Sequence, residues 1–245
     1  MNIVILGATG GIGSELSKAL AAKNNLFLGA QNIDKLNNLK IELNDMTKNT
    51  FEGDILDASS FKNVEYFMQM ANHNLGHIDA VINCVGSLIL KPAHLTSEDE
   101  LLNTIKINLF SSFAIIKYGI KYLRNSGGNM IFFSSSAAKI GLANHEAIAC
   151  SKGAIESLVT SSASTYAKFN IRINSISPGL VETNLTEKII NNKTSLDYSK
   201  KLHALNRIGK PKNFLPIIKC LLDPDSDWIT GQNFAVDGGL SKLKE

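Results

Sequence analysis

The amino-acid sequence predicts one α/β domain built on a doubly wound, seven-stranded parallel sheet. Short apolar runs alternate with longer amphipathic segments, a glycine-rich turn follows the first apolar run, and no linker, repeat or low-complexity tract divides the 245 residues. Alternating strands and helices form βαβ units, whose right-handed crossovers cover both faces of a parallel sheet. We therefore expect residues 1–245 to form a single domain.

Seven short apolar runs are expected to form the strands. Most are rich in Ile, Val, Leu or Phe and are bounded by glycine or polar residues, as is typical of strands buried on both faces. In chain order the expected strands are Ile3–Leu6, Leu26–Gly29, Asn49–Gly53, Ile78–Val85, Asn129–Ser134, Arg172–Ile176 and Asn233–Val236.

The segments between these strands have the apolar periodicity of amphipathic helices. The expected helices are Ile12–Ala22, Asp34–Leu43, Ser59–Asn74, Ser97–Arg124, Glu146–Phe169, Thr186–Leu205 and Pro211–Leu222. Residues 191–201 are polar and the least patterned part of the chain. Two interpretations of them stay open: a solvated surface helix, or part of a mobile lid over a substrate.

The composition narrows the classes of partner. The formal net charge is only +3 and no Lys/Arg block occurs, so neither nucleic acid nor a membrane surface is expected. No apolar stretch approaches the roughly 20 residues of a membrane helix, and the N-terminal apolar run ends at a glycine too early for a signal peptide. Cys84, Cys150 and Cys220 lie far apart without CxxC spacing. We therefore expect no disulfide framework, no metal site and a cytoplasmic location.

The clearest functional motif is the glycine pattern Gly7-x-x-x-Gly11-x-Gly13, directly after the first expected strand. Glycines there permit a tight turn, bring the backbone close to phosphates and let a helix pack on a strand. The following helix, which begins near Ile12, would point its free N–H groups at a pyrophosphate. The motif therefore predicts a Rossmann-type fold that binds the pyrophosphate of a dinucleotide.

Further motifs follow this turn in order. They are Asp54-Ile55, Asn83-Cys84-Val85-Gly86, Pro178-Gly179-Leu180-Val181-Glu182-Thr183, Ile229-Thr230-Gly231-Gln232 and Val236-Asp237-Gly238-Gly239. Together they resemble the motifs of the short-chain dehydrogenase/reductase family from Ile3 to Ser241, with Leu6 where that family usually has threonine. The resemblance implies an NAD(P) site formed by Gly7, Thr9, Gly11, Ile12, Gly13, Gln31, Asp54, Ile55, Asn83, Val85, Gly86, Lys152, Pro178, Gly179, Val181 and Thr183.

The choice between NAD and NADP depends on the end of the second strand. An acidic residue there would accept the ribose hydroxyls of NAD and repel a 2′-phosphate. This chain has Gly29-Ala30-Gln31-Asn32, with no acid before Asp34 and no arginine to pair with the phosphate. Gly10 also stands where NADP-preferring relatives often have a basic residue. The missing acid removes a penalty against NADP, so we favour NADP and leave NAD open.

The resemblance also implies a catalytic set, from which one member is missing. Lys152 corresponds to the lysine that binds the ribose, Ser135 to the serine that polarises the substrate oxygen, and Asn108 to the helix asparagine, which would hold a proton-relay water. The proton-donating tyrosine should stand four residues before Lys152, but that position is Ile148. An isoleucine cannot move a proton.

His145 is the candidate substitute for the tyrosine. Enoyl-acyl-carrier-protein reductases, distant members of the same superfamily, place their tyrosine seven residues before the lysine, with an apolar residue at the usual position. The same spacing here gives His145, Ile148 and Lys152, which can share one helix face, and imidazole exchanges protons near neutral pH. The alternative is that His145 is a polar residue on the loop entering the helix.

Two hypotheses about function therefore remain. The first is an NAD(P)-dependent oxidoreductase that transfers hydride between nicotinamide and a carbonyl or activated alkene substrate, with His145, water or the substrate itself delivering the proton. The second is a catalytically weak or inactive nucleotide-binding protein that acts as a sensor or partner subunit. The resemblance further implies a substrate lid over about residues 184–210 and a homodimer or homotetramer formed through Leu109–Tyr122, Ala154–Phe169 and the C-terminal strand.

Overall fold

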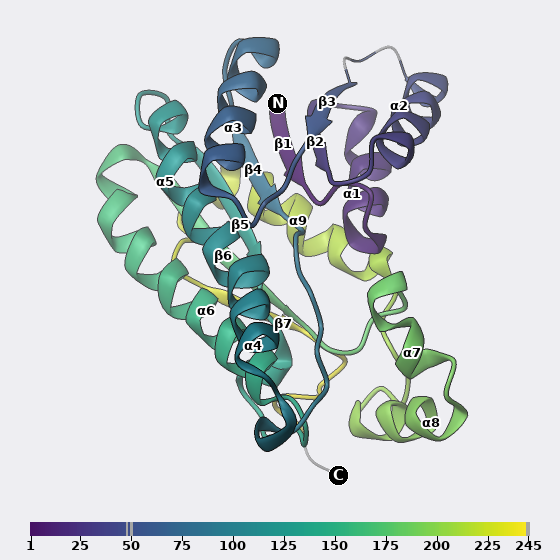
Figure 1. Ribbon diagram of the computed structural model, residues 1–245. Helices are drawn as coiled ribbons and strands as arrows, with labels where there is room; N and C mark the ends of the chain where they lie inside the picture. Colours follow the sequence, from purple (N-terminus) through teal and green to yellow (C-terminus); the bar gives the residue numbers. More distant parts are fainter. Residues whose placement is uncertain (48, 50, 244–245) are drawn as a thin grey trace.

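The sheet is seven-stranded, parallel and doubly wound, as the sequence predicts. The computed structural model describes residues 1–47, 49 and 51–243, and these form one parallel sheet in the order β3-β2-β1-β4-β5-β6-β7 (Figure 1). The strands are β1 (Asn2–Leu6), β2 (Asn25–Ala30), β3 (Phe51–Ile55), β4 (Ala80–Asn83), β5 (Gly128–Phe133), β6 (Ile171–Pro178) and β7 (Asn233–Val236). The order reverses between β1 and β4, and ligands of open α/β sheets bind at the carboxyl ends of strands at such a point.

All seven expected strands are present; the last has the expected bounds, four differ by one or two residues at one or both ends, and two differ by two residues at both ends. The third was expected at Asn49–Gly53 and is shifted to Phe51–Ile55, because its pairing with β2 continues to the last residue of β2; Thr50 lies outside the described residues. The fourth was expected at Ile78–Val85 and is shorter, because the Asn83 side chain accepts a hydrogen bond from the Val85 N–H and turns the chain out of the sheet.

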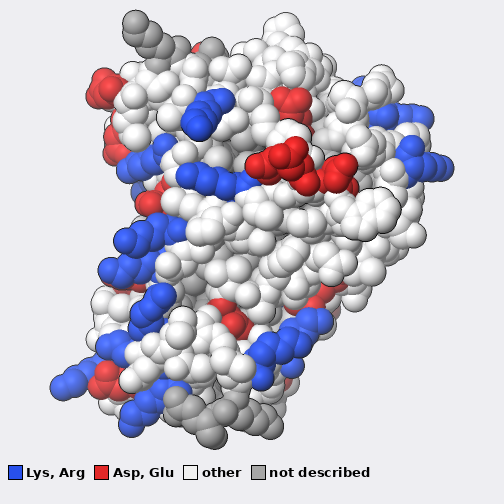
Figure 2. Space-filling view, turned by 180° about the vertical axis from the view of Figure 1, so that it is seen from behind, with Lys and Arg blue, Asp and Glu red and all other residues white. Residues whose placement is uncertain are grey.

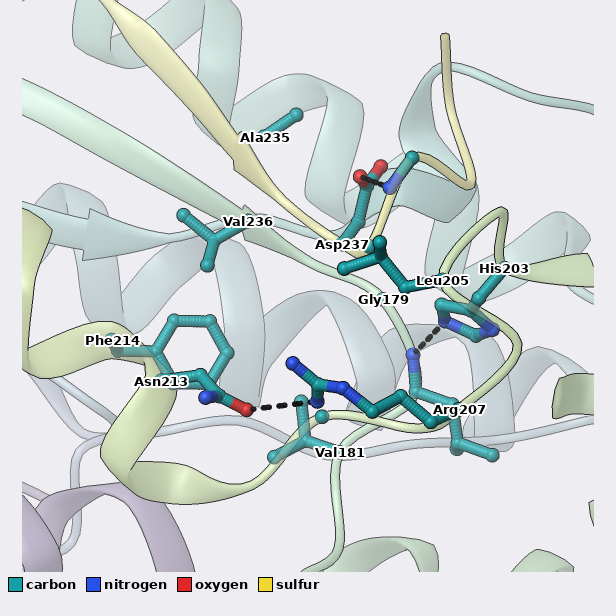
Figure 3. A pocket seen from close by; sticks show the side chains of 14 residues that line it. Gly179, Val181, His203, Leu205, Arg207, Asn213, Phe214, Ala235, Val236 and Asp237 are labelled. Atoms are coloured by element: carbon teal, nitrogen blue, oxygen red, sulfur yellow. Dashed lines mark hydrogen bonds between the residues drawn. The ribbon is translucent and has the colours of Figure 1, made fainter. Parts of the chain in front are cut away.

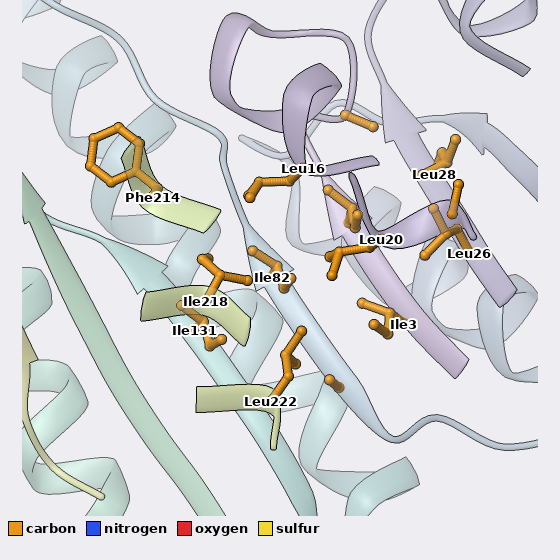
Figure 4. Packing of buried hydrophobic residues seen from close by; sticks show 14 of the residues in the cluster. Ile3, Leu16, Leu20, Leu26, Leu28, Ile82, Ile131, Phe214, Ile218 and Leu222 are labelled. Atoms are coloured by element: carbon orange, nitrogen blue, oxygen red, sulfur yellow. The ribbon is translucent and has the colours of Figure 1, made fainter. Parts of the chain in front are cut away.

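Helices cover both faces of the sheet (Figure 1). One face is covered by α1 (Gly11–Ala21), α2 (Ile33–Met46) and α9 (Leu215–Leu222), and the other by α3 (Phe61–Leu75), α5 (Ser111–Leu123) and α6 (Glu146–Tyr166). Leu16 and Leu20 of α1 pack with Ile82 of β4 and Ile218 of α9 in the first of these layers (Figure 4). Full burial of one such side chain contributes about 1.5–3 kcal/mol, so the core fixes the strand ends on which the site is built.

The long helix expected over Ser97–Arg124 is interrupted. It begins with a capping box between Ser97 and Glu100 and comprises α4 (Glu98–Ile105), one π-helical turn (Lys106–Phe110) and α5. A π turn inserts one extra residue into the helical repeat and is frequent at functional sites. Here it contains Asn108, which is completely buried.

The single helix expected over Thr186–Leu205 is two helices. They are α7 (Glu187–Ile190) and α8 (Lys193–Leu202), and the break occurs because the Asn192 side chain accepts a hydrogen bond from the Ser195 N–H and caps a new helix. Both helices project from the body of the domain (Figure 1). A backbone bridge between Val181 and Gly209 closes the base of this projecting segment.

The charges of the surface are mixed. On the face shown in Figure 2, lysine and arginine side chains are most frequent along one edge, and acidic side chains lie among and beside them. A broad area without charged side chains lies in the middle of this face. The formal net charge of +3 is therefore not gathered in a single patch on this face. Within the described ranges, no helix is long and apolar enough to cross a membrane.

Candidate active site

The glycine turn after β1 has a geometry that other residues cannot adopt. Gly7 has a φ of +74°, and its carbonyl accepts a hydrogen bond from the Gly10 N–H at 3.0 Å. A Cβ on Gly13 would lie 2.2 Å from the Gly7 oxygen. The first helical turn of α1 therefore packs directly against the glycine turn, with no room for a side chain at Gly13.

The N-terminus of α1 fits the pyrophosphate of a dinucleotide. Gly10 is its N-cap and offers no side chain to the first N–H groups of the helix, which are left to bind an anion. The side chain of Thr183 lies over this end of the helix, because a Cβ on Gly11 would be 2.6 Å from its methyl group. Thr183, predicted from the sequence as a cofactor residue, thus lies beside the glycine turn.

The residues predicted to hold the adenosine half lie at the carboxyl ends of β2 and β3. Asp54 pairs with Gly29 and Ile55 with Ala30 in the sheet, and the Ile55 N–H donates to the Asp54 carboxylate at 2.7 Å. Gln31 is exposed directly after β2. The strand pairing thus places Gln31 and Asp54 on neighbouring strand ends at the edge where the glycine turn also lies.

A cleft of about 480 Å³ lies at the nicotinamide half of the site. It is bounded by the strand ends on one side and by α7 and α8 on the other. The predicted residues that line it are Ile12, Val85, Gly86, Ser135, His145, Lys152, Pro178, Gly179, Val181 and Thr183, together with Ile148. The structure thus brings three of the four expected catalytic residues, Ser135, His145 and Lys152, to one cavity.

Asn83 and Asn108 lie behind the cleft wall. The Asn83 amide donates to the Ser112 hydroxyl at 3.1 Å and its oxygen holds the Val85 N–H. The Asn108 amide donates to the hydroxyl of Ser87 and to the carbonyl of Thr104, both at 2.9 Å, and its oxygen accepts the Ser87 N–H. Both asparagines therefore shape the segment after β4 from behind.

Of three consecutive serines, Ser135 alone has a hydroxyl hydrogen free for a substrate. The hydroxyl of Ser134 donates to the Lys152 carbonyl and to Glu156, and that of Ser136 donates to Asp237 at 2.7 Å. Ser135 Oγ only accepts, from the Ala137 N–H at 3.2 Å, within the described part of the chain. Its O–H can donate into the cleft that it lines.

Lys152 is a buried cation at the floor of the cleft. Its ammonium donates to the Phe133 carbonyl at 2.8 Å. The residue as a whole is only 7% exposed. Burial lowers its pKa to about 8. Burial likewise raises the pKa of the Cys84 thiol to about 12, opposed by Lys152. At neutral pH the lysine is therefore mostly charged and the thiol neutral.

His145 is the N-cap of α6 and lines the cleft with Ile148. Its Nδ1 lies 2.7 Å from the Ala143 carbonyl, which can only accept, so Nδ1 carries a hydrogen. In the neutral ring Nε2 is then an acceptor. The preceding Asn144 has a φ of +63° and its carbonyl accepts the Lys91 N–H at 2.8 Å, which fixes the turn that orients the ring.

Glu156 is a buried acid that sequence reasoning missed. One carboxylate oxygen accepts hydrogen bonds from Ser134, Ser177 and Asn233 at 2.9–3.1 Å, and the other pairs with Lys139. It thus joins the strand end that carries Ser135 to the strand that leads into the Pro178 loop. A Glu four residues after Lys152 on the same helix face was the only sequence signal.

His203 was also missed. It lies just after α8, is buried, and donates from Nδ1 to the Ser199 carbonyl at 2.6 Å. Its Nε2 accepts the Leu180 N–H at 3.1 Å (Figure 3), and a Cβ on Gly179 would lie 2.5 Å from this nitrogen. His203 therefore ties the end of the projecting helices to the loop that follows Pro178, and separates the cleft from a second cavity of about 310 Å³.

Comparison with known proteins assigns this arrangement to a family. The family model described as Enoyl-(Acyl carrier protein) reductase matches residues 7–241. A chloroplastic tropinone reductase homolog of Arabidopsis thaliana is 31% identical over 98% of this chain and 76% of its own length. An uncharacterized oxidoreductase of Bacillus subtilis is 29% identical over 97% of this chain and 89% of its own length. The chain belongs to the short-chain dehydrogenase/reductase family, and it is an oxidoreductase that binds a nicotinamide cofactor.

Solved structures share the fold. Levodione reductase has a TM-score of 0.94 at 22% identity, covering 99% of this chain and 98% of that one. A variant of actinorhodin polyketide ketoreductase with NADPH has a TM-score of 0.92 at 21% identity, with the same coverage. The predicted Rossmann-type architecture is thereby confirmed.

Proposed function

We propose that the protein is an NADP-preferring reductase of a carbonyl or activated alkene compound. The observation that carries the proposal is the shared cleft of Ser135, His145 and Lys152, directly above the strand ends and glycine turn. When bound, the reduced nicotinamide supplies a hydride to the electrophilic carbon of the substrate. The absence of an acidic residue from Ala30 to Asn32 supports NADP over NAD.

Each residue of the cleft has a distinct proposed role. Ser135 donates its free hydroxyl hydrogen to the substrate oxygen. Lys152 donates to the ribose from the Phe133 side of the cleft. The side-chain oxygen of Asn108 accepts the Ser87 N–H with one lone pair, and its second lone pair accepts from a relay water. His145 in its doubly protonated form delivers a proton from Nε2, because the Ala143 carbonyl retains the hydrogen on Nδ1.

The test is turnover with NADPH or NADH and a panel of ketones, enals and enoyl thioesters, followed by absorbance of the reduced cofactor. Turnover should occur, and His145→Ala should abolish it or change its pH profile. An unchanged profile in His145→Ala would remove the histidine from the mechanism and leave water or the substrate as proton source. Tight cofactor binding without turnover anywhere on the panel would overturn the enzymatic role.

A second candidate function rests on Ile148. Its side chain is 3% exposed and occupies the position from which a tyrosine would donate a proton. A protein that binds the cofactor but does not use it would act as a sensor or partner subunit. Such a protein should change its thermal stability or its assembly on binding NADPH while leaving every compound of the panel unchanged.

We propose that the protein assembles as a homodimer or homotetramer in the cytoplasm. Phe110 and Phe113 are 41% and 50% exposed on the π turn and α5, and both rings contact Phe61 with centroids 6.3 and 6.2 Å apart. An exposed aromatic cluster of this kind is typical of an interface. Exposed thiols at Cys150 and Cys220 suit a reducing compartment. Light scattering of the wild type and of Phe113→Glu tests the assembly, which the charge should dissociate.

The segment of about residues 184–210 is proposed as the substrate lid. The segment contributes Leu185, Ile189 of α7 and Tyr198 of α8 to the cleft wall, and Val181 and Gly209 join at its base. Substrate should therefore slow amide hydrogen exchange in α7 and α8 of the cofactor-bound protein.

A further inference from the structure

The substrate half of the cleft is walled by large apolar side chains from three separate segments. They are Leu88 and Leu90 after β4, Leu142 before α6, and Leu185, Ile189 and Tyr198 of the lid segment. Three of them are strongly exposed, with 41% for Leu90, 53% for Leu185 and 64% for Tyr198. These side chains do not belong to either hydrophobic core of the described residues.

This exposed apolar surface indicates a ligand of matching chemistry. Side chains that face an open cavity and remain in water gain free energy when an apolar compound displaces that water. Contiguous exposed apolar surface bordered by polar groups marks binding sites on soluble proteins. The polar border here is at the inner end, where Ser135, His145 and Lys152 lie.

The charges of the cleft have one sign. Among the described residues that line it there is no aspartate or glutamate, and its ionisable groups other than tyrosine are Lys152, His145, His203 and the thiol of Cys84. The thiol is neutral at neutral pH, and both ring nitrogens of His203 are engaged with the protein. The fixed charge in the cleft is therefore the ammonium of Lys152, and the proton-donating form of His145 adds a second charge of the same sign.

This arrangement disfavours both kinds of charged substrate. A cation entering the cleft would lose water, find no carboxylate and be repelled by Lys152. A carboxylate placed among Leu88, Leu90 and Leu185 would lose water without gaining a charged donor, because Lys152 already binds the Phe133 carbonyl. An uncharged compound has neither cost.

We propose that the cleft selects uncharged, mainly apolar ketones or enones and rejects compounds of the same shape that carry an ammonium or carboxylate group. The proposal rests on the reductase function proposed above, because it concerns the substrate of the same site. Its discriminating surface is the apolar wall formed by the segment after β4 and the lid.

The test uses ring ketones that differ in charge but hardly in shape. They are 4,4-dimethylcyclohexanone, its isostere N,N-dimethyl-4-oxopiperidinium, and 4-oxocyclohexanecarboxylate. We expect kcat/KM with NADPH to be at least about tenfold higher for the neutral ketone than for either ion. Binding to the NADP⁺-loaded protein, measured by saturation-transfer NMR and calorimetry, should follow the same order. A cation or anion that binds as well as the neutral ketone would overturn the proposal.

The two readouts separate this proposal from the reductase function. If no ketone is turned over but the neutral one binds selectively, the reductase function fails and the selectivity stands. If turnover occurs without preference for the neutral ketone, the selectivity fails and the reductase function stands.

A matched set of variants locates the selectivity in the wall. Leu185→Glu places a carboxylate at an exposed position of the cleft, and should shift the ratio of cation to neutral affinity by at least about fivefold towards the cation. Leu185→Gln controls for shape, and Thr194→Glu adds the same charge at an exposed lid position that does not line the cleft. Equal shifts in Leu185→Glu and Thr194→Glu would show that the selectivity does not arise from the cleft wall.

Discussion

The buried ammonium of Lys152 gives a quantitative prediction for cofactor binding. Its pKa is lowered from 10.5 to about 8 by burial. In its proposed role it donates to the ribose, and the neutral amine is a weaker donor without charge. If only the ammonium form binds, the apparent dissociation constant of NADPH should be about twofold higher at pH 8 and about tenfold higher at pH 9 than at neutral pH.

The stability of the cofactor-free protein should change in the opposite direction. Because the pKa of Lys152 is lower in the folded than in the unfolded protein, the folded state binds fewer protons between about pH 8 and pH 10.5, and its free energy of unfolding rises with pH over this window. With a pKa lowered from 10.5 to about 8, the free energy of unfolding should rise by about 3 kcal/mol at most across this window.

Fluorescence titration with NADPH and urea unfolding across this pH range measure the two effects. Lys152→Met should remove both pH dependences while weakening cofactor binding at neutral pH. Cofactor affinity that stays constant through pH 8, or that falls equally in Lys152→Met, would refute the assignment of Lys152 as the ribose-binding cation.

Three further predictions concern the turn, the missing proton donor and the lid anchor. Gly13→Ala should cost about 1–3 kcal/mol of stability and abolish NADPH binding, because its Cβ would lie 2.2 Å from the Gly7 oxygen; chemical unfolding and fluorescence titration measure this. Ile148→Tyr should raise ketone reduction by NADPH, since it restores a proton donor beside the cleft. His203→Ala should cost about 1–3 kcal/mol by leaving the Leu180 N–H without its partner, and should raise KM more than it lowers kcat.

Each of these has a control. Gly153→Ala, inside α6 with its nearest contact 4.0 Å from the new Cβ, should stabilise the protein by about 0.5–1 kcal/mol without changing NADPH binding. Ile148→Phe adds a ring without a hydroxyl, so equal activity in the Phe and Tyr variants would contradict the missing-donor explanation. A His203→Ala variant with unchanged KM would show that the imidazole serves folding alone.

The fold was largely predictable because its signals are local. The strands follow from short apolar runs bounded by glycine or polar residues, and the helices between them from a periodicity of 3.6 residues. The glycine turn follows from the steric limits at Gly7 and Gly13. The interruptions were not predictable in the same way. The break at Asn192 depends on one side-chain hydrogen bond, and the π turn around Asn108 changes no feature of the apolar pattern.

The site was predictable where motifs define it and not where contacts are distant. Ser135, Lys152 and His145 line one cleft, as their spacing implied. His203 contacts Leu180 across 23 residues of sequence, and Glu156 contacts Asn233 across 77. No local pattern identifies such partners, since they depend on how the lid and the last strand return to the sheet.

The most direct test of the account is isotope transfer from the cofactor. Incubation with NADPH deuterated at C4 of the nicotinamide and with the neutral ring ketone or its enone should yield product that contains one deuterium at the carbonyl carbon or at the β-carbon, detected by mass spectrometry. Tight binding of the deuterated cofactor with no deuterium in any product would contradict the reductase function and favour the sensor or partner role.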